Sequence, residues 1–489
     1  MIKESKTGES NSSKSLYKMK TFWIFLFGVS LAFPANAQNS YNLFFNTESG
    51  KARFAAGEIH TALNKREGKV IDQPLTALDH SGLTKNSVVL LDISAKEASE
   101  IMKDAGIKNA AELKEEGFII HKSGKKGKTI LVLGKDESGM MYGGLEIAEI
   151  IETRGIEYVE NQLQNPYMKV RGTKFNIPLD VRTPSYTDVS DAAQNNIAEM
   201  WSFDFWKEYI DNLARYRYNT ISLWSLHPFP SMVKVPEYPD VALEDVRRST
   251  GAWRENYELS GMGFDSPEIV NNYEVLKKMT IEEKMDFWRK VMSYGKERNV
   301  QFFVLTWNIF VNGTDGKYGI TDKLENPVTR DYFRKSIRQM VLEYPDLAGI
   351  GLTTGENMYD YTNEQKEEWA FETYGKGVLD AIEQQPGRKI NLIHRQHQTT
   401  ATEITKIFKD VFSNPDINFI FSFKYAKAHV YSSTTQVYHH DFVEDIKRAN
   451  FKTLWTNCKN SASAGEVAKT MIKQTGIIKR NEAAIRLKD

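Results

Sequence analysis

From residue 168 to residue 456, short apolar runs alternate with longer segments whose apolar residues recur at helical spacing. The apolar runs lie at 168–179, 219–226, 300–307, 347–353, 389–395, 417–424 and 451–456. The helical segments lie at 203–217, 281–297, 329–343, 363–384 and 400–412. Strands that alternate with helices pair in parallel through crossover connections. The pattern therefore predicts an α/β fold, a (β/α)8 TIM-type barrel over residues 166–457, in preference to an open doubly wound sheet.

Residues 38–165, which precede this repeat, have the pattern of a small α/β domain. The run at 87–93 predicts a strand, and the runs at 117–121 and 128–134 predict a hairpin around a Gly- and Lys-rich turn. Residues 138–151 predict a helix. Because no chemically active side chains cluster here, we expect this domain to act as a scaffold or to shape the substrate entrance.

Residues 458–489 form an atypical polar tail. They contain no Phe, Trp or Tyr, although aromatic residues make up 12% of the chain. An eighth barrel strand would have to lie in this tail, and Ile477 and Ile478 are its one weak candidate. The sequence leaves open whether the barrel is complete or incomplete at its C-terminal end.

Residues 1–37 have the order of a secretory signal peptide. Lys18 and Lys20 precede the apolar run 21–34, and Ala35-Asn36-Ala37 follows it. A basic start, a short apolar core and a small-x-small site predict cleavage after Ala37 and export to the periplasm or the medium. An uncleaved anchor is the alternative, but the apolar run is short for a membrane span.

Charge and cysteine content narrow the function further. The 489 residues carry a formal net charge of zero, which argues against a basic surface for nucleic acid. Cys458 is the single cysteine, so neither an internal disulfide nor a cysteine-based zinc site can form. The sequence predicts no cofactor, no metal site and no membrane association after signal cleavage, and it leaves the oligomeric state open.

The fourth barrel strand carries the strongest candidate acid. Glu356 and Asn357 follow the apolar run 347–353 on a Gly-rich turn. In (β/α) barrels the catalytic groups lie at the carboxyl ends of the strands. Glu356 is therefore the predicted general acid, and a salt-bridge role inside the barrel is its structural alternative. A second carboxylate is not evident, although Asp180 and Asp360 are available.

Further candidates for substrate binding recur at the other predicted strand ends. Tryptophans offer flat faces for sugar rings, and Arg offers two parallel hydrogen bonds to a carboxylate. Each could instead be a core or structural residue, and a lysine within an apolar strand needs an anionic partner. The candidates are Arg171, Lys174, Trp224, Trp307, Asn308, His394, Arg395, His397, Lys424 and Trp455, in addition to Asn357. The long loop 227–279 is either a lid over this pocket or a surface insertion.

Two stretches resemble the α-glucuronidase group of glycoside hydrolases, families 67 and 115. The first runs from Glu116 to Gly134 and on through Gly139-Met140-Met141-Tyr142-Gly143-Gly144-Leu145. The second is the barrel opening Arg171-Gly172-Thr173-Lys174-Phe175-Asn176 together with Gly355-Glu356. The resemblance covers most of residues 50–457 and implies a small α/β domain before a (β/α)8 barrel, hydrolysis of a bond to a uronic acid, and Glu356 in the acid position. The later carboxylates of family 67 have no match here.

The sequence thus predicts a glycoside hydrolase that acts on an oligosaccharide or polysaccharide containing uronic acid or another acidic sugar. A noncatalytic or truncated glycan-binding protein is the alternative. A polysaccharide lyase, with His394, His397 or Tyr425 as the base, is a third and weaker one.

Overall fold

The computed structural model describes residues 39–78, 86–123, 129–185, 191–250, 266–355, 358–396, 399–424, 437–449 and 454–457. Within these residues, no helix is both long enough and apolar enough to cross a bilayer. The predicted signal peptide and the polar tail lie outside the described residues.

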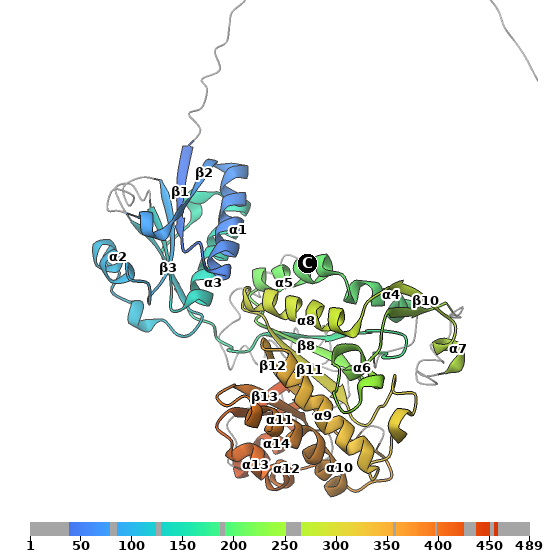
Figure 1. Ribbon diagram of the computed structural model, residues 1–489. Coiled ribbons are helices and arrows are strands. Elements are labelled where there is room, and N and C mark those ends of the chain that lie inside the picture. Colours follow the sequence, from blue (N-terminus) through green and yellow to red (C-terminus); the bar gives the residue numbers. More distant parts are fainter. Residues whose placement is uncertain are drawn as a thin grey trace, which may run out of the picture.

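A six-stranded sheet forms the first domain, with the strand order β2-β1-β3-β5-β4-β6 (Figure 1). Strands β1, β2, β3 and β5 pair in parallel, while β4 is antiparallel to β5 and β6, as expected for the predicted hairpin. Helices α1 and α3 pack together and share one apolar core with the sheet. The elements are β1 (Asn39–Phe45), α1 (Gly50–Arg66), β2 (Gly68–Pro74), β3 (Ser87–Asp92), α2 (Ala98–Ala105), β4 (Phe118–Ser123), β5 (Thr129–Gly134), α3 (Glu137–Thr153) and β6 (Gln162–Gln164).

Local chemistry sets the start of α3 and its close approach to β4. The Asp136 side chain accepts a hydrogen bond from the Gly139 amide and caps the helix. A Cβ atom on Gly139 would lie 2.2 Å from the Gly117 carbonyl oxygen, which leaves space for glycine alone. The glycines singled out in the sequence thus allow the helix to press against the sheet.

The second unit contains a parallel sheet of seven strands in the order β15-β14-β13-β12-β11-β8-β7, with helices outside it (Figure 1). This arrangement confirms the predicted barrel-type α/β fold. Among the described residues, β7 and β15 do not pair with each other, so the sheet is not closed there. The strands are β7 (Gly172–Asn176), β8 (Thr220–Ser225), β11 (Gln301–Trp307), β12 (Leu347–Thr353), β13 (Ile390–Arg395), β14 (Ile417–Lys424) and β15 (Leu454–Asn457).

The helices that accompany these strands follow the predicted segments closely. The predicted helix 363–384 is continuous but contains a π-helical segment at Phe371–Gly375 between α10 and α11. The helices are α4 (Asp191–Met200), α5 (Phe203–Arg215), α6 (Phe229–Met232), α8 (Ile281–Lys296), α9 (Pro327–Glu343), α10 (Asn363–Ala370), α11 (Lys376–Gln384), α12 (Ala401–Ile407), α13 (Lys409–Ser413) and α14 (Val437–Arg448).

Side chains of the barrel strands alternate between two apolar layers. One layer packs the outer faces of the strands against the helices, and Leu223, Val304 and Leu392 belong to it. The other layer consists of residues from the strands and from the segments next to them, and it covers the inner face of the curved sheet. It contains Trp224, Leu226, Phe303, Leu305, Trp307, Ile393 and Ile420. This alternation decides which candidate residues can reach the inside of the barrel.

The long connection after β8 contains small elements of its own. Helix α6, the strands β9 (Val246–Ser249) and β10 (Tyr273–Lys277), and the short helix α7 (Pro267–Val270) lie along it. β9 and β10 form an antiparallel pair. The apolar residues around α6, such as Phe229 and Met232, are buried in the main core, so this part of the connection belongs to the packed body of the domain. Residues 251–265 lie outside the described residues.

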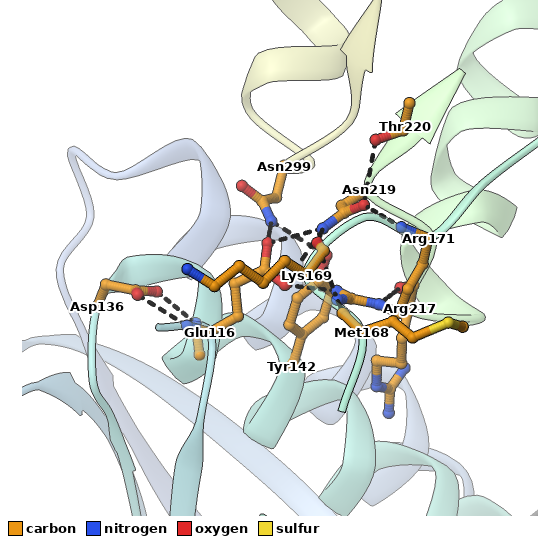
Figure 2. A network of polar contacts seen from close by, with 11 residues as sticks. Glu116, Asp136, Tyr142, Met168, Lys169, Arg171, Arg217, Asn219, Thr220 and Asn299 are labelled. Atoms are coloured by element: carbon orange, nitrogen blue, oxygen red, sulfur yellow. Dashed lines mark hydrogen bonds and ion pairs between the residues drawn. The ribbon is translucent and has the colours of Figure 1, made fainter. Parts of the chain in front are cut away.

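The first domain docks onto the amino ends of three barrel strands through Glu116 (Figure 2). Its carboxylate accepts hydrogen bonds from Arg171 at 2.5 Å, Asn219 at 3.0 Å and Asn299 at 2.6 Å. Arg171 and Asn219 directly precede β7 and β8, and Asn299 lies two residues before β11. The first domain therefore lies at the end of the sheet opposite to the carboxyl ends of the strands.

Tyr142 of α3 belongs to the same junction. Its hydroxyl accepts a hydrogen bond from Asn299 at 3.1 Å, and the guanidinium of Arg171 lies 5.6 Å from the centre of its ring. Burial and the nearby Glu116 charge raise the pKa of Tyr142 to about 12, so its hydroxyl stays protonated. The junction is consequently a compact polar network around one carboxylate.

Candidate active site

Four of the predicted substrate-binding residues meet inside the barrel. The Lys174 ammonium lies 4.4 Å from the ring centre of Trp224 and 4.7 Å from that of Trp307. The two indole rings are 4.6 Å apart between centroids, and the Arg395 guanidinium lies 5.6 Å from the Trp224 ring. Two cations and two indoles from β7, β8, β11 and β13 thus form one group, which we call the Lys174–Arg395 cluster.

Hydrogen bonds from neighbouring strands fix this cluster. The Trp224 indole N–H donates to the Ser222 hydroxyl at 2.6 Å, and Arg395 donates to the Thr353 hydroxyl at 3.0 Å. Arg395 is nearly buried, whereas Lys174 is exposed on β7. Lys174 can therefore meet a ligand from solvent, while Arg395 and the indoles form a rigid background.

His394 lies on the other face of β13, away from this cluster. Its Nε2 atom donates to a Glu367 carboxylate oxygen at 2.6 Å, and both side chains are completely buried. The prediction placed His394 beside Arg395 in the pocket because the two are adjacent in sequence. Adjacent strand residues point to opposite faces, and this alternation directs His394 to α10 and away from a sugar.

Arg171 also lies apart from the other candidates. It precedes β7, at the amino end of the strand, and donates to Glu116 and to the backbone carbonyls of Arg217 and Met168 (Figure 2). The apolar run 168–179 predicts one long strand with Arg171 near the pocket. The observed strand begins only at Gly172, which puts Arg171 at the domain junction.

The chain turns sharply after β11, next to the cluster. Asn308 is completely buried, and its amide donates to the Thr353 carbonyl at 3.3 Å. Ile309 follows with φ of +49°, in the left-handed region that β-branched residues rarely adopt. Backbone strain of this kind persists where surrounding packing imposes it, often beside functional sites. The hydrogen bond between Asn308 and Thr353 holds the ends of β11 and β12 together.

The structure does not describe the side chains of several candidate residues. Glu356, Asn357 and His397 lie outside the described residues. Of Lys424 and Trp455, the structure describes the backbone positions, at the end of β14 and within β15. The described chain leads from β12 through Thr354 to Gly355, whose φ of +100° requires a glycine.

Neither suggested second carboxylate faces this cluster. Asp180 is buried and accepts two hydrogen bonds from the Arg182 side chain, at 2.7 and 3.0 Å, and one from the Arg247 amide. Both of its oxygens are therefore engaged in a structural ion pair. Asp360 is exposed in the turn after Met358.

Residues that the sequence reasoning missed include Ser222, Thr353 and Glu367, each of which orients a candidate. No sequence signal distinguishes them, since a hydroxyl in a strand or a Glu in a helix is common. Among the described residues, no group of three or more His, Cys, Asp or Glu side chains could hold a metal ion.

Comparisons with known proteins agree with this two-part architecture. Residues 34–146 match the family model described as "Glycosyl hydrolase family 67 N-terminus". No sequence among the curated proteins matches the chain. The first domain is therefore similar to the N-terminal domain of family 67 glycosyl hydrolases, as the resemblance implied.

Solved structures resemble the chain over most of its length. A family GH138 enzyme targeting pectin rhamnogalacturonan II aligns with 86% of this chain at 18% identity and a TM-score of 0.59. An N-acetyl-β-hexosaminidase from Streptomyces plicatus aligns with 85% of it at 13% identity and a TM-score of 0.51. The chain spans 42% of the first protein and 70% of the second. At these identities the comparisons establish the fold alone.

Proposed function

We propose that this chain is a glycoside hydrolase of the α-glucuronidase-like type, acting on glycans that contain uronic acid or another acidic sugar. The observation that carries the proposal is the Lys174–Arg395 cluster, two cations against two indoles at the inner face of the barrel. Indole faces suit sugar rings, and a nearby cation suits a sugar carboxylate.

The fold supports this assignment independently of the cluster. A family 67 type N-terminal domain precedes the barrel, and a protein of similar fold targets a pectin. Barrel enzymes place their chemistry at the strand carboxyl ends, and Trp224, Trp307 and Arg395 are the last or next-to-last residues of their strands. Lys174 contacts both indoles from the middle of β7.

Glu356 is our candidate general acid, since it follows β12 by three residues in the sequence. A protonated carboxyl assists departure of the leaving group in glycoside hydrolysis. Glu356→Gln keeps the shape of the side chain but removes its titratable proton. Turnover of a natural substrate should fall by roughly 10²–10⁴-fold, the span of general acid catalysis, while binding is retained.

The test is a screen of the purified protein on uronate-containing oligosaccharides and on the same oligosaccharides with reduced carboxyl groups. Turnover restricted to the acidic set supports the proposal. Unsaturated products that absorb in the ultraviolet would indicate a lyase instead, and binding without turnover would indicate a glycan-binding protein. For Glu356→Gln, a substrate with an activated leaving group should lose less activity, and equal losses on both substrates would reject the acid role.

A further inference from the structure

The ends of β12 and β13 are joined on both faces of the sheet. On the inner face, Arg395 donates to the Thr353 hydroxyl. On the outer face, the Glu367 carboxylate of α10 accepts a hydrogen bond from the Thr354 hydroxyl at 3.0 Å and one from His394 at 2.6 Å. Thr353 and Arg395 are direct partners in the strand register, so the contacts on both faces act at the same level of the sheet.

Glu367 is an unusual residue for its position. It is completely buried between α10 and the sheet, on a helix whose other buried residues are Lys366, Trp369 and Ala370. Burial raises the pKa of this carboxyl, but the charge of His394 and the hydrogen bonds from His394 and Thr354 outweigh it and leave the pKa below its ordinary value. The carboxylate is thus ionised and accepts hydrogen bonds from the segments that follow β12 and end β13.

Stability alone is a weak reason for such a pair. Replacing a buried ion pair by apolar residues of similar volume is often neutral or stabilising. The pair does, however, restrict geometry, because each of its hydrogen bonds requires a particular backbone position. The segments it restricts are the ends of β12 and β13, and Arg395 lies at the second of these.

We propose that Glu367 is a positioning residue that, through Thr354 and His394, holds the ends of β12 and β13 in the arrangement the site requires. This inference rests on the proposed function for its catalytic consequence. Thr354 lies two residues before Glu356 in the sequence, and His394 directly precedes Arg395. One buried carboxylate therefore fixes the backbone that leads to the candidate acid and to one of the two cations of the cluster.

The test removes one arm of this arrangement at a time. Thr354→Val deletes the hydroxyl with little change in volume, and Thr354→Ser restores it. Thr329→Val is the matched control. Thr329 lies on α9 and is also completely buried, and its hydroxyl donates a hydrogen bond to the Thr321 carbonyl. Hydrogen exchange is measured in peptides covering 347–355 and 390–396, together with kcat and KM on a uronate oligosaccharide.

In Thr354→Val we expect about tenfold faster exchange in both peptides, as follows from loss of a hydrogen bond to a charged group. We also expect kcat to fall by about 10- to 100-fold with KM nearly unchanged, because the acid and its substrate are misaligned while the pocket survives. Thr354→Ser should recover both properties. Thr329→Val should change neither, although its melting temperature falls.

Unchanged exchange in Thr354→Val would overturn the proposal, and so would faster exchange with an unchanged kcat. If the wild-type protein hydrolyses no acidic glycan, the proposed function fails. The exchange data then still decide whether Glu367 holds the two strand ends. Equal effects of Thr354→Val and Thr329→Val would show general destabilisation and would also overturn the positioning role.

Discussion

The guanidinium of Arg171 and the carboxylate of Glu116 meet at 2.5 Å across the junction between the two domains, at the amino end of β7. Both side chains are largely buried, at 14% and 13% exposure. The residues of the Lys174–Arg395 cluster lie on β7, β8, β11 and β13, inside the barrel. Each of them is farther along its strand than the amino end at which the first domain docks. The domain junction and the candidate active site are therefore separate parts of the molecule, and mutations should affect them separately.

Glu116→Gln should destabilise the protein without impairing its chemistry. The change leaves Arg171 buried without its counter-charge, which costs about 3 kcal/mol in the free energy of unfolding. Glu58→Gln is the control, because the Glu58–Arg215 pair also joins the domains but is more exposed and contributes about 1 kcal/mol or less. Chemical denaturation measures both changes. A large loss of kcat at a temperature where Glu116→Gln is folded would contradict the separation of the two parts.

Lys174→Met should weaken the binding of acidic glycans selectively. Loss of a charged hydrogen-bond donor at the ligand should raise the Kd for a uronate oligosaccharide by about 10- to 100-fold. The Kd for the same oligosaccharide with a reduced carboxyl group should change little, and Lys174→Arg should retain much of the selectivity. Calorimetric titration measures the constants. Equal weakening for both ligands would show that Lys174 supports the indoles and does not read charge.

His227 should make stability depend on pH between about 4 and 6.5. Burial lowers the pKa of His227 from 6.5 to about 4, although its contact with the Asn312 carbonyl opposes the shift. The unfolded chain therefore takes up a proton below pH 6.5, whereas the folded protein does so only below about pH 4. Stability falls as the pH falls through this window, by up to about 3 kcal/mol.

The measurement for His227 is the difference in unfolding free energy between the wild type and His227→Gln. Titration of the carboxylates cancels in this difference, because both proteins carry them. The wild-type advantage should shrink from pH 6.5 to pH 4 and then level off. A difference that is constant across this range would show that His227 titrates alike in both states.

Export is a proposal from the sequence and has a direct test. Expressed with its own N-terminus in a bacterial host, the protein should appear outside the cytoplasm. Its N-terminal sequence should begin at Gln38, since cleavage is expected after Ala37. Ala37→Arg should block processing. A mature protein that retains residues 21–34 would contradict the proposal.

The sequence predicted the barrel strands well because buried parallel strands leave continuous apolar runs. The runs at 347–353 and 417–424 coincide with β12 and β14. Strands β9 and β10 were not predicted, because they form a short pair with mostly polar, partly exposed residues such as Arg247 and Glu274. Apolar periodicity carries no information about such elements.

The sequence placed some of the candidate residues correctly, and the differences have a geometric origin. Lys174, Trp224, Trp307 and Arg395 come together as expected, because their side chains lie on the inner face of neighbouring parallel strands. His394 was grouped with them although it faces the helices. Glu367 was not predicted as part of the site. It lies on a helix, 27 residues before its partner His394, and the sequence does not indicate which strand a helical residue will contact.

The π-helical segment Phe371–Gly375 determines which residues of α10 and α11 face the core. Each residue rotates an α-helix by about 100°, so one extra residue shifts the phase of everything beyond it. Glu367 before the segment and Val378 after it are both completely buried. Deleting a single residue within 371–375 would restore α-helical spacing and rotate α10 relative to α11 by about 100°. In the resulting helix Glu367 and Val378 could no longer both be buried, because the rotation would turn one of them away from the core.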